Sequence, residues 1–484
     1  MFKKEVYISR RARLVDDLLQ YCAITESMRP GPGIFSKPGN IILLLANNEA
    51  PRNYAGNTYD FRQDSTFLYF CGLNDEAAGF ALVIDCDSNK TILFGNDIDM
   101  DDVIWMGPQP SVAERASSVG IEESRAFGEL SQYIKSKVRG GARVHYIPPY
   151  RADNMILLNS LLDIPVEQLK EKASVELIRA VVAQRVLKDE NEIAEMDHAC
   201  NIGYDMHYTV MSSARLGMVE QELAGMAVGV AHKYGAGESF PTILSQNGET
   251  MHNHRHNQIL TDGRLVVMDA GAEAMSNYCS DFTRTFPSSG KFNQRQSEIY
   301  NIVLDANNLA QALAKPGVMY KEVHLAVARL ITVGLKDLGL MKGDVDEAVA
   351  AGAHALFFPH GLGHNIGLDV HDMEDLGEKY VGYNKYIERS TQFGLSALRM
   401  ARTLGPGMVV SDEPGIYFIP ALIDQWKAAG TNAQFINFDK VETYKDFGGI
   451  RLEDDILITY EGCRLLGDRR LPITISEVEE AMRK

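Results

Sequence analysis

Four carboxylates and one imidazole in the second half of the chain stand in short motifs whose residue types bind divalent metal ions. They are Asp269 in VVMDAG, Asp281 in SDFTRTFP, His364 in HGLGHNIGLDVHD, Glu413 in DEPGIYF and Glu453 in GIRLEDD. Together they carry about four negative charges, and burying that much uncompensated charge has a prohibitive free-energy cost. Two divalent cations would neutralise it, and two metal ions about 3.5–4 Å apart can activate a water molecule. The set predicts a two-metal hydrolytic site.

Short strands must position these residues. Asp269 ends the apolar run Leu265–Met268, and Asp281 immediately precedes FTRTFP. Two adjacent strands joined by a short loop would bring both carboxylates to one end of a sheet, and Gly271 allows a sharp turn between them. His364 lies among glycines that disfavour a helix, so its segment is expected to be a loop or strand whose backbone passes close to a ligand.

The five motifs resemble those of the "pita-bread" metallopeptidases, and within them the proline-directed branch of aminopeptidase P and prolidase. This similarity extends from about Val186 to the C-terminus. A second similarity covers Tyr59–Asn74 (YDFRQDSTFLYFCGLN) and VIWMG around Trp105, which resemble the N-terminal domain of that branch. The resemblance implies an α+β fold in which a smaller three-layer α/β domain, residues 1–170, precedes a catalytic pita-bread (creatinase/aminopeptidase) domain, residues 171–484.

The resemblance also implies a ligand set for two divalent ions per chain. Asp281 and Glu453 would bridge the metals, Asp269 would hold one, and His364 and Glu413 would hold the other. Oxygen-rich ligation with one imidazole and no thiolate suits manganese, or cobalt or ferrous iron in vitro, better than a structural zinc. Two such ions lower the pKa of a shared water, so that hydroxide forms near neutral pH and attacks the scissile carbonyl.

Three histidines are expected around the substrate. By resemblance, His360 and His371 face it, and His252 takes the place of a further active-site histidine. The neighbouring His254 and His256 leave the last assignment open by two residues. His252 or His371 would stabilise the developing oxyanion together with a metal.

Other side chains have supporting roles in this interpretation. Glu413 would take the proton from water and deliver it to the leaving proline nitrogen. Arg451, two residues before Glu453, would orient that carboxylate, and Tyr417 would line the substrate pocket. Asp412 departs from the family's pattern, in which an apolar residue precedes the glutamate. It either tunes metal affinity or, as we favour, points away on the alternate strand face.

The expected activity is hydrolysis between an N-terminal residue and a following proline, as in an Xaa-Pro aminopeptidase. The alternative is an Xaa-Pro dipeptidase (prolidase), because Arg399 stands where prolidases place an arginine that binds the carboxylate of a dipeptide. The insert Ile419–Phe447 is also prolidase-like, although Arg399 can equally pair with an acidic neighbour. A non-catalytic binding module is the remote alternative, since such relatives lose the metal ligands.

Hydrophobic patterns predict the elements that carry these motifs. In the first part of the chain, a helix over 8–27 precedes strand-like segments NIILLLA, TFLYFCGL, GFALVID and KTILFG, followed by helices near 112–119 and 130–138. Asp189–Glu192 has the form of a capping box and opens the second part. Helices over 219–234, 294–314 and 320–338 then alternate with short strands.

Composition limits the partners. The net charge of −17 argues against nucleic acid and anionic membranes, which require a basic face, and no apolar run is long enough to span a membrane. The six cysteines are widely spaced, which favours reduced thiols in a cytoplasmic protein. The expected partners are peptides with proline in the second position. A homodimer or homotetramer is also expected, because the N-terminal domain of this branch packs on a neighbouring subunit.

Overall fold

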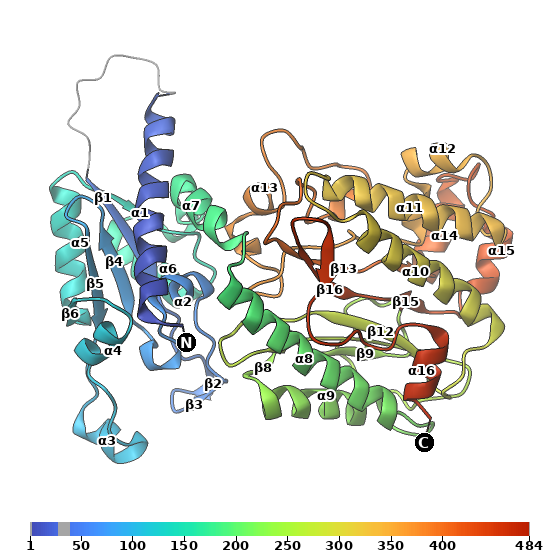
Figure 1. Cartoon of the computed structure of the whole chain (residues 1–484), viewed down its shortest axis with the longest axis horizontal. Helices are drawn as coiled ribbons and strands as arrows, with labels where there is room; N and C mark the ends of the chain where they lie inside the picture. The colour runs from blue at the N-terminus through green and yellow to red at the C-terminus, as the bar shows by residue number, and fades with distance from the viewer. Residues whose placement is uncertain (1, 28–38, 484) are drawn as a thin grey trace. The chain divides into compact units, whose positions relative to one another are not determined.

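The computed structural model describes residues 2–27 and 39–483, and the chain divides into two compact units, Met1–Arg185 and Val186–Lys484. The sequence-based division at 170/171 falls earlier, before helix α7 (Val175–Arg185). This helix packs against α1 (Lys4–Ser27) and therefore belongs to the first unit. Figure 1 shows the helices and strands of both units.

The first unit is built on a five-stranded sheet in the order β6-β5-β4-β1-β7. The strands are β1 (Asn40–Leu45), β4 (Ala81–Asp85), β5 (Lys90–Gly95), β6 (Glu123–Ala126) and β7 (Arg143–His145). β4 is antiparallel to β1 and β5, whereas β6 and β7 lie parallel to their neighbours β5 and β1. A short hairpin, β2 (Pro51–Tyr54) with β3 (Asn57–Thr58), lies outside this sheet.

Both faces of this sheet are covered, which gives the three layers. Side chains alternate along a strand, so that Ile41 and Leu43 of β1 pack with residues of α5 (Leu130–Arg139) and α6 (Ala152–Leu162). Ile42 and Leu44 are buried on the opposite face, where β1 contacts α2 (Ser65–Cys71) and α2 contacts α1. The remaining helices of this unit are α3 (Met100–Met106) and α4 (Val112–Ser118).

One element of the first unit was assigned wrongly from the sequence. TFLYFCGL reads as a strand, but these residues form helix α2. Asp64 caps the helix by accepting a hydrogen bond from the Phe67 amide, and Gly72 ends it in the left-handed region with φ of 87°. A short, wholly apolar run has no periodicity that distinguishes a strand from a buried helix, so the capping residues decide.

The second unit consists of two halves that follow the same order, a helix pair and then strands. In the first half, α8 (Glu190–Ser213) and α9 (Glu220–Tyr234) pack on β9 (Ile243–Ser245), β10 (Leu265–Ala270) and β12 (Phe282–Pro287). The expected capping box is present, because Asp189 and Glu192 bond each other's backbone amides. A small pair, β8 (Gly237–Glu238) with β11 (Ala272–Glu273), completes this half.

The second half repeats that order. Its helices are α10 (Gln294–Leu313) and α11 (Tyr320–Asp337), and α12 (Val345–Ala350) and α13 (Glu378–Val381) are short. Its strands are β13 (Val409–Asp412), β14 (Gly415–Tyr417), β15 (Gly449–Arg451), β16 (Asp454–Ile458) and β17 (Cys463–Leu465). The strands of the two halves lie between the helix pairs α8–α9 and α10–α11 (Figure 1), in the mixed arrangement expected of a pita-bread domain.

The prolidase-like insert folds into α14 (Pro420–Ala429), α15 (Phe438–Val441) and a following 3-10 turn, and α16 (Ile475–Ala481) closes the unit. No helix within 2–27 or 39–483 is long and apolar enough to cross a membrane.

Candidate metal centre

Asp269 and Asp281 are brought together by the pairing of two strands. β10 and β12 are antiparallel with Asp269 opposite Thr283, and Asp281 stands directly before β12. Gly271 is needed for the close approach of two backbone segments rather than for a turn. A Cβ atom at this position would lie 1.8 Å from the Ser280 carbonyl oxygen. The two strand ends can therefore pass each other only with glycine at this position.

Glu453 reaches the same place from the other half of the unit. It lies between β15 and β16, and its amide donates to the Thr283 carbonyl oxygen at 3.0 Å. The Thr283 hydroxyl donates to Glu453 Oε2 at 2.7 Å. Contact between β12 and the start of β16 thus joins the two halves at the carboxylates.

His364 and Glu413 come from one backbone pairing. The Ser411 amide donates to the His364 carbonyl oxygen at 2.9 Å, and the Glu413 amide donates to the Leu362 carbonyl oxygen at 2.9 Å. A Cβ on Gly363 would lie 2.1 Å from the Ser411 carbonyl oxygen, so glycine is needed for this approach. The loop carrying His364 therefore runs beside β13, as the glycine-rich sequence indicates.

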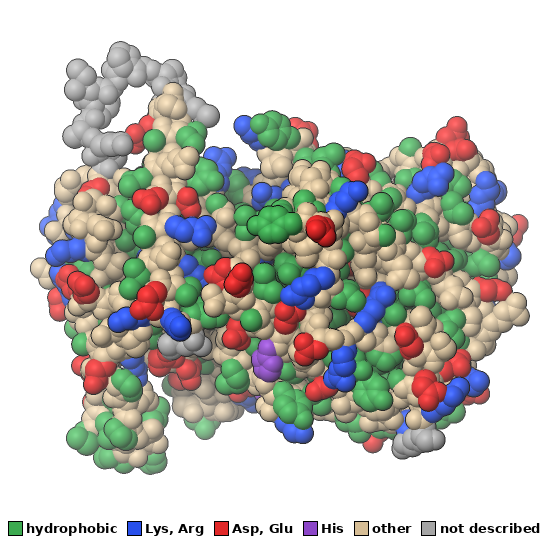
Figure 2. Space-filling model, viewed as in Figure 1, with side chains coloured by type: hydrophobic (Ala, Val, Ile, Leu, Met, Phe, Trp, Pro, Cys, Tyr) green, Lys and Arg blue, Asp and Glu red, His purple; other side chains and the backbone are tan. Residues whose placement is uncertain are grey.

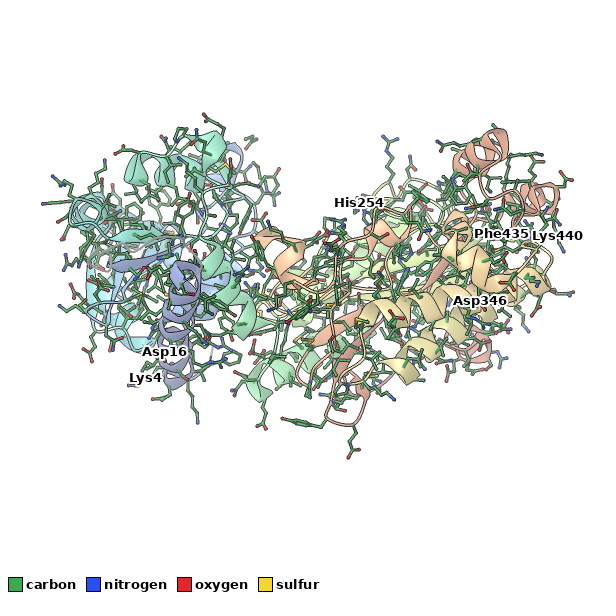
Figure 3. All side chains as sticks on the ribbon, turned by 90° about the horizontal axis from the view of Figure 1, so that it is seen from above. Lys4, Asp16, His254, Asp346, Phe435 and Lys440 are labelled. Atoms are coloured by element: carbon green, nitrogen blue, oxygen red, sulfur yellow. The ribbon has the colours of Figure 1, made fainter. Side chains whose placement is uncertain are left out.

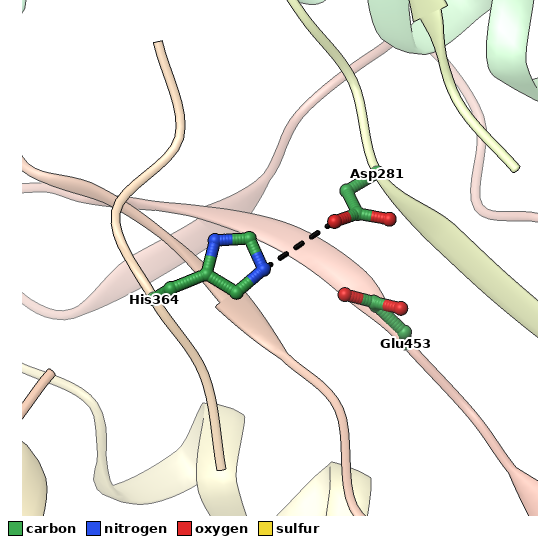
Figure 4. Close-up of side chains that lie close together, drawn as sticks. All are labelled: Asp281, His364 and Glu453. Carbon is green, nitrogen blue, oxygen red and sulfur yellow. Dashed lines mark ion pairs between the residues drawn. The ribbon is translucent and has the colours of Figure 1, made fainter. Parts of the chain in front are cut away.

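Hydrogen-bond acceptors converge at the centre of this arrangement (Figure 4). Nδ1 of His364 lies 3.1 Å from the Asn365 carbonyl oxygen and must donate to it, which leaves Nε2 with its lone pair. Nε2 lies 3.4 Å from Asp281 Oδ2 and 3.6 Å from Glu413 Oε1. One potential ligand atom from each of Asp281, His364 and Glu453 lies within 4.8 Å of the others.

Two of the carboxylate oxygens lack a hydrogen-bond donor. Within the described part of the chain, Asp269 Oδ1 and Asp281 Oδ1 are buried without a hydrogen-bond partner. Burial, and then the charges of Asp269, Asp455 and Glu413, raise the pKa of Asp281 well above its usual range. Burial and the neighbouring carboxylates likewise raise the pKa of Glu453 well above its usual range. The residues fit a cationic group, which would replace the missing donors.

Arg451 has a different partner from the one expected. Its Nη2 lies 2.6 Å from Asp269 Oδ2, and its Nε donates to the Thr283 hydroxyl at 3.1 Å. It therefore orients Asp269 directly and reaches Glu453 through Thr283. Thr283 was not identified from the sequence, although it stands on the same motif as Asp281.

Tyr417, expected to line the pocket, lies behind it. The side chain is fully buried, and its hydroxyl accepts from Arg451 Nη1 at 2.8 Å. The hydroxyl also lies 2.9 Å from His360 Nε2, while His360 Nδ1 donates to the Gly361 carbonyl oxygen at 2.8 Å. Tyr417 therefore supports His360 and Arg451 rather than contacting the cavity.

A cavity of about 600 Å³ opens over the carboxylates. The predicted site residues in its wall are His252, Asp269, Asp281, His360, His364, His371, Arg399, Glu413, Arg451 and Glu453. His254 shares this wall, and its side chain is exposed on the second unit (Figure 3). His256 Nδ1 instead bonds the Leu244 carbonyl oxygen at 2.9 Å.

His371 is held by a carboxylate that sequence analysis did not identify. Its Nδ1 lies 2.5 Å from Glu374 Oε2, and its ring centroid lies 3.9 Å from that of His364. Burial, followed by the charge effects of His364, Arg399 and His252, lowers the pKa of His371. Arg399 is also paired with Glu374.

Asp412 points away from the cavity, as the alternation of strand faces predicts. It is fully buried, and its Oδ2 accepts from Gln311 Nε2 of α10 at 3.1 Å. Ser411, the residue before it, faces the site instead, because its hydroxyl donates to Glu413 Oε1 at 3.2 Å.

Comparisons with known proteins find relatives for both parts of the chain. The model of Metallopeptidase family M24 matches residues 194–460, and that of the aminopeptidase P N-terminal domain matches residues 7–145. The Xaa-Pro aminopeptidase of Escherichia coli (strain K12) is 34% identical over 435 residues, covering 88% of this chain and 90% of that protein. The Xaa-Pro dipeptidase of Homo sapiens is 30% identical over 471 residues, covering 95% and 91%.

Comparison with solved structures also finds aminopeptidase P. The structure of Zn-substituted E. coli aminopeptidase P in complex with product has a TM-score of 0.78 and 30% sequence identity, and the match covers 100% of both chains. The chain therefore belongs to metallopeptidase family M24, with a pita-bread metallopeptidase domain that follows an N-terminal domain of the aminopeptidase P type.

Proposed function

We propose that this chain is a metal-dependent exopeptidase that hydrolyses the bond between an N-terminal residue and a following proline. The observation that carries the proposal is the lone pair of His364 Nε2 facing two carboxylates beside a cavity of about 600 Å³. Cations between these acceptors would compensate their buried charge. Similarity over most of the chain to a protein named Xaa-Pro aminopeptidase supplies the substrate class.

Two divalent ions per chain are proposed, with manganese as the favoured metal. Asp269, Asp281, His364, Glu413 and Glu453 would hold them, since all five line one cavity. The donor set of four carboxylates and one imidazole supports a metal that prefers oxygen ligands. Bound there, the ions would supply the Lewis acidity that activates water and polarises the substrate carbonyl.

The chain's own residues would move the proton and hold the substrate. Burial raises the pKa of Glu413, which lines the cavity, and this favours a role in taking and returning a proton. The leaving proline nitrogen must receive that proton, because it departs as a secondary amine. Arg451 would hold the Asp269 carboxylate in place through its hydrogen bond to Oδ2.

The two substrate-facing histidines are proposed to differ in role. Because Nδ1 of His371 donates to Glu374, the Nε2 of the neutral ring is an acceptor, which suits a donor group of the substrate. His252 has no such constraint from Glu374 and is the better candidate to donate to the oxyanion. His360, held by Gly361 and Tyr417, would form a fixed wall of the cavity.

A dipeptidase is the second candidate, and Arg399 is the observation that favours it. Its side chain is 38% exposed and lies in the cavity wall, where it could meet a substrate carboxylate. A relative named Xaa-Pro dipeptidase covers nearly the whole chain. The pairing of Arg399 with Glu374 weighs against this reading.

The test is hydrolysis by protein loaded with manganese. We expect release of alanine from Ala-Pro-Ala, little release from Ala-Ala-Ala, and loss of activity in Asp281→Ala. The matched control is Asp412→Asn, which changes a buried carboxylate that points away from the cavity and should leave the enzyme active. Equal hydrolysis of the two tripeptides would contradict the proline specificity, and cleavage of Ala-Pro alone would assign a dipeptidase.

We further propose a homodimer or homotetramer that works in the cytoplasm. Helix α3 supports the oligomer, because Met100, Ile104, Trp105 and Met106 are exposed on it, with Trp105 at 86%. Figure 2 shows hydrophobic side chains gathered over this helix. None of the six cysteines, all of which lie among the described residues, forms a disulfide, which suits a reducing compartment. An active monomer in sedimentation at micromolar concentration would contradict the oligomer.

A further inference from the structure

Acidic and basic side chains alternate around Arg399, which lies in the cavity wall. Arg399 Nη1 is paired with Glu374 Oε1 and lies 3.8 Å from Glu378 Oε1. Glu378 Oε2 in turn lies 2.6 Å from Arg389 Nη1, and Glu374 Oε2 lies 2.5 Å from His371 Nδ1. The guanidinium in the cavity wall is thus already balanced by carboxylates of its own chain.

We propose that Glu374 is a specificity-determining residue that withholds Arg399 from the C-terminal carboxylate of an Xaa-Pro dipeptide. The consequence is a preference for peptides that continue beyond the proline. This inference rests on the proposed Xaa-Pro exopeptidase function and refines its substrate class.

The carboxylate of a dipeptide would compete with that of Glu374 for the Arg399 guanidinium. A dipeptide carboxylate at Arg399 would replace an existing ion pair, so it would gain little from a new one, and it would approach Glu374 and Glu378, which repel it. An amide or a further residue after proline carries no such charge and avoids the repulsion. An arginine without an acidic partner would instead favour the dipeptide.

Solvent exposure allows the Arg399–Glu374 ion pair to break without unfolding the chain. The Arg399 side chain is 38% exposed and that of Glu374 is 32% exposed, so neither is locked in the protein interior. A partly exposed pair of this kind contributes little to folding. Neutralising Glu374 should therefore release the guanidinium to a ligand rather than unfold the segment.

Glu374 has a second contact that the choice of substitution must respect. Its other oxygen accepts from His371 Nδ1, and a glutamine can keep this hydrogen bond while losing the charge. Glu374→Gln thus isolates the charge effect. Glu374→Ala also removes the acceptor of His371, and kcat should then fall for every substrate.

The experiment measures the ratio of kcat/KM for Ala-Pro to that for Ala-Pro amide, which differ only in the charged carboxylate. In the wild-type protein the ratio should be near one or below. In Glu374→Gln it should rise roughly ten- to a hundredfold, the range expected for a charge-assisted pair. The double variant Glu374→Gln/Arg399→Ala should return to the wild-type ratio.

Controls separate this effect from a general change of charge. Glu388 is exposed in the same segment, and Glu388→Gln makes the same charge change without altering the ratio. An unchanged ratio in Glu374→Gln would overturn the proposal. A second result would also overturn it, namely that Arg399→Ala in an otherwise wild-type protein selectively lowers hydrolysis of Ala-Pro. Arg399 would then already bind the carboxylate of the dipeptide.

Failure of the proposed function gives a different result. If metal-loaded wild-type protein hydrolyses neither Ala-Pro-Ala nor the two dipeptide forms, the activity is wrong. Calorimetry can then measure the binding of Ala-Pro and of Ala-Pro amide to the same variants, and this still tests whether Glu374 withholds Arg399 from the dipeptide carboxylate. Tighter binding of Ala-Pro after Glu374→Gln, lost in the double variant, supports the inference, and equal binding in all variants overturns it.

Discussion

Glu453 and Asp454 are neighbours in the chain, are equally buried, and have opposite electrostatic surroundings. Glu453 faces the cavity with Asp281, and burial with neighbouring carboxylates raises its pKa well above the usual range. Asp454 faces the other side, 2.5 Å from Arg284 Nη2 and 3.2 Å from Arg470 Nη2. These two guanidinium groups overcome the effect of burial and lower the pKa of Asp454.

The difference shows two ways of compensating buried charge on one short segment. For Asp454 the protein supplies the cations, so the group is structural. Among the described residues Asp281 pairs with His364 and Glu453 accepts from Thr283, and neither has an ion pair with Lys or Arg, which suits the metal ions proposed above. Successive residues point to opposite faces of a strand, which allows both solutions side by side.

The largest expected effect comes from removing a carboxylate on the cavity side. Glu453→Ala should lose all measurable turnover of Xaa-Pro peptides while keeping its fold, because a proposed metal ligand is lost. Removing repulsive charge should leave the metal-free protein at least as stable as wild type. Kinetics and thermal unfolding of the same preparation provide the measurements. Metal-dependent activity in this variant would contradict the assignment.

Substitutions on the opposite face, around Asp454, should instead lower the free energy of unfolding. Arg284→Met leaves Asp454 with less compensation inside the protein, and breaking a buried pair in this way costs about 3–5 kcal/mol. Urea unfolding of the metal-free protein measures this change. The variant Arg284→Met/Asp454→Leu should recover part of the loss, since it removes the unpaired charge. A loss below about 1 kcal/mol in the single variant would show that Arg470 suffices.

Proton release on metal binding gives a smaller effect of definite sign. Because the folded-state pKa values of Asp281 and Glu453 are raised, these groups stabilise the metal-free fold at low pH. That contribution is lost as the pH rises above the unfolded values of about 4 and through the folded values. Metal ions must displace the protons, so affinity should rise with pH. Calorimetry in two buffers of different ionisation enthalpy measures the release, and Asp281→Ala should reduce it.

Two buried histidines provide a third case of buried ionisable groups, and the smallest expected effect on stability. His324 of α11 and His354 are buried with ring centroids 6.4 Å apart, and their ring nitrogens have no hydrogen-bond partner among the described residues. Burial lowers the pKa of His324 to about 3 and that of His354 to about 4. Below the unfolded value of about 6.5 the unfolded state takes up protons first, so stability falls until the folded values are reached.

The corresponding variant is His354→Phe, which removes one of these groups without leaving a large cavity. Its unfolding free energy should depend less on pH between about 6.5 and 4 than that of wild type, by up to about 1.4 kcal/mol per pH unit. Urea unfolding at pH 7 and pH 5 measures the difference. Identical pH dependence in the two proteins would show that other groups control the acid response.

Much of the site could be predicted because its chemistry constrains residue types. Asp269, Asp281, His364, Glu413 and Glu453 reach one cavity, as their motifs indicate. The face of Asp412 also followed from strand alternation. A capping box and glycine-rich segments placed the elements around them, since these signals act over a few residues.

The tertiary structure alone decided which groups pair over long distances. Arg451 bonds Asp269 rather than Glu453, Tyr417 lies behind His360, and Arg399 is occupied by Glu374. The helix α2 also depends on where Asp64 and Gly72 fall around an ambiguous apolar run. A sequence states which charges a chain carries and on which face of an element they stand. The partner of each charge is set by the packing of whole elements, because ion pairs form between the side chains that packing brings within a few ångströms.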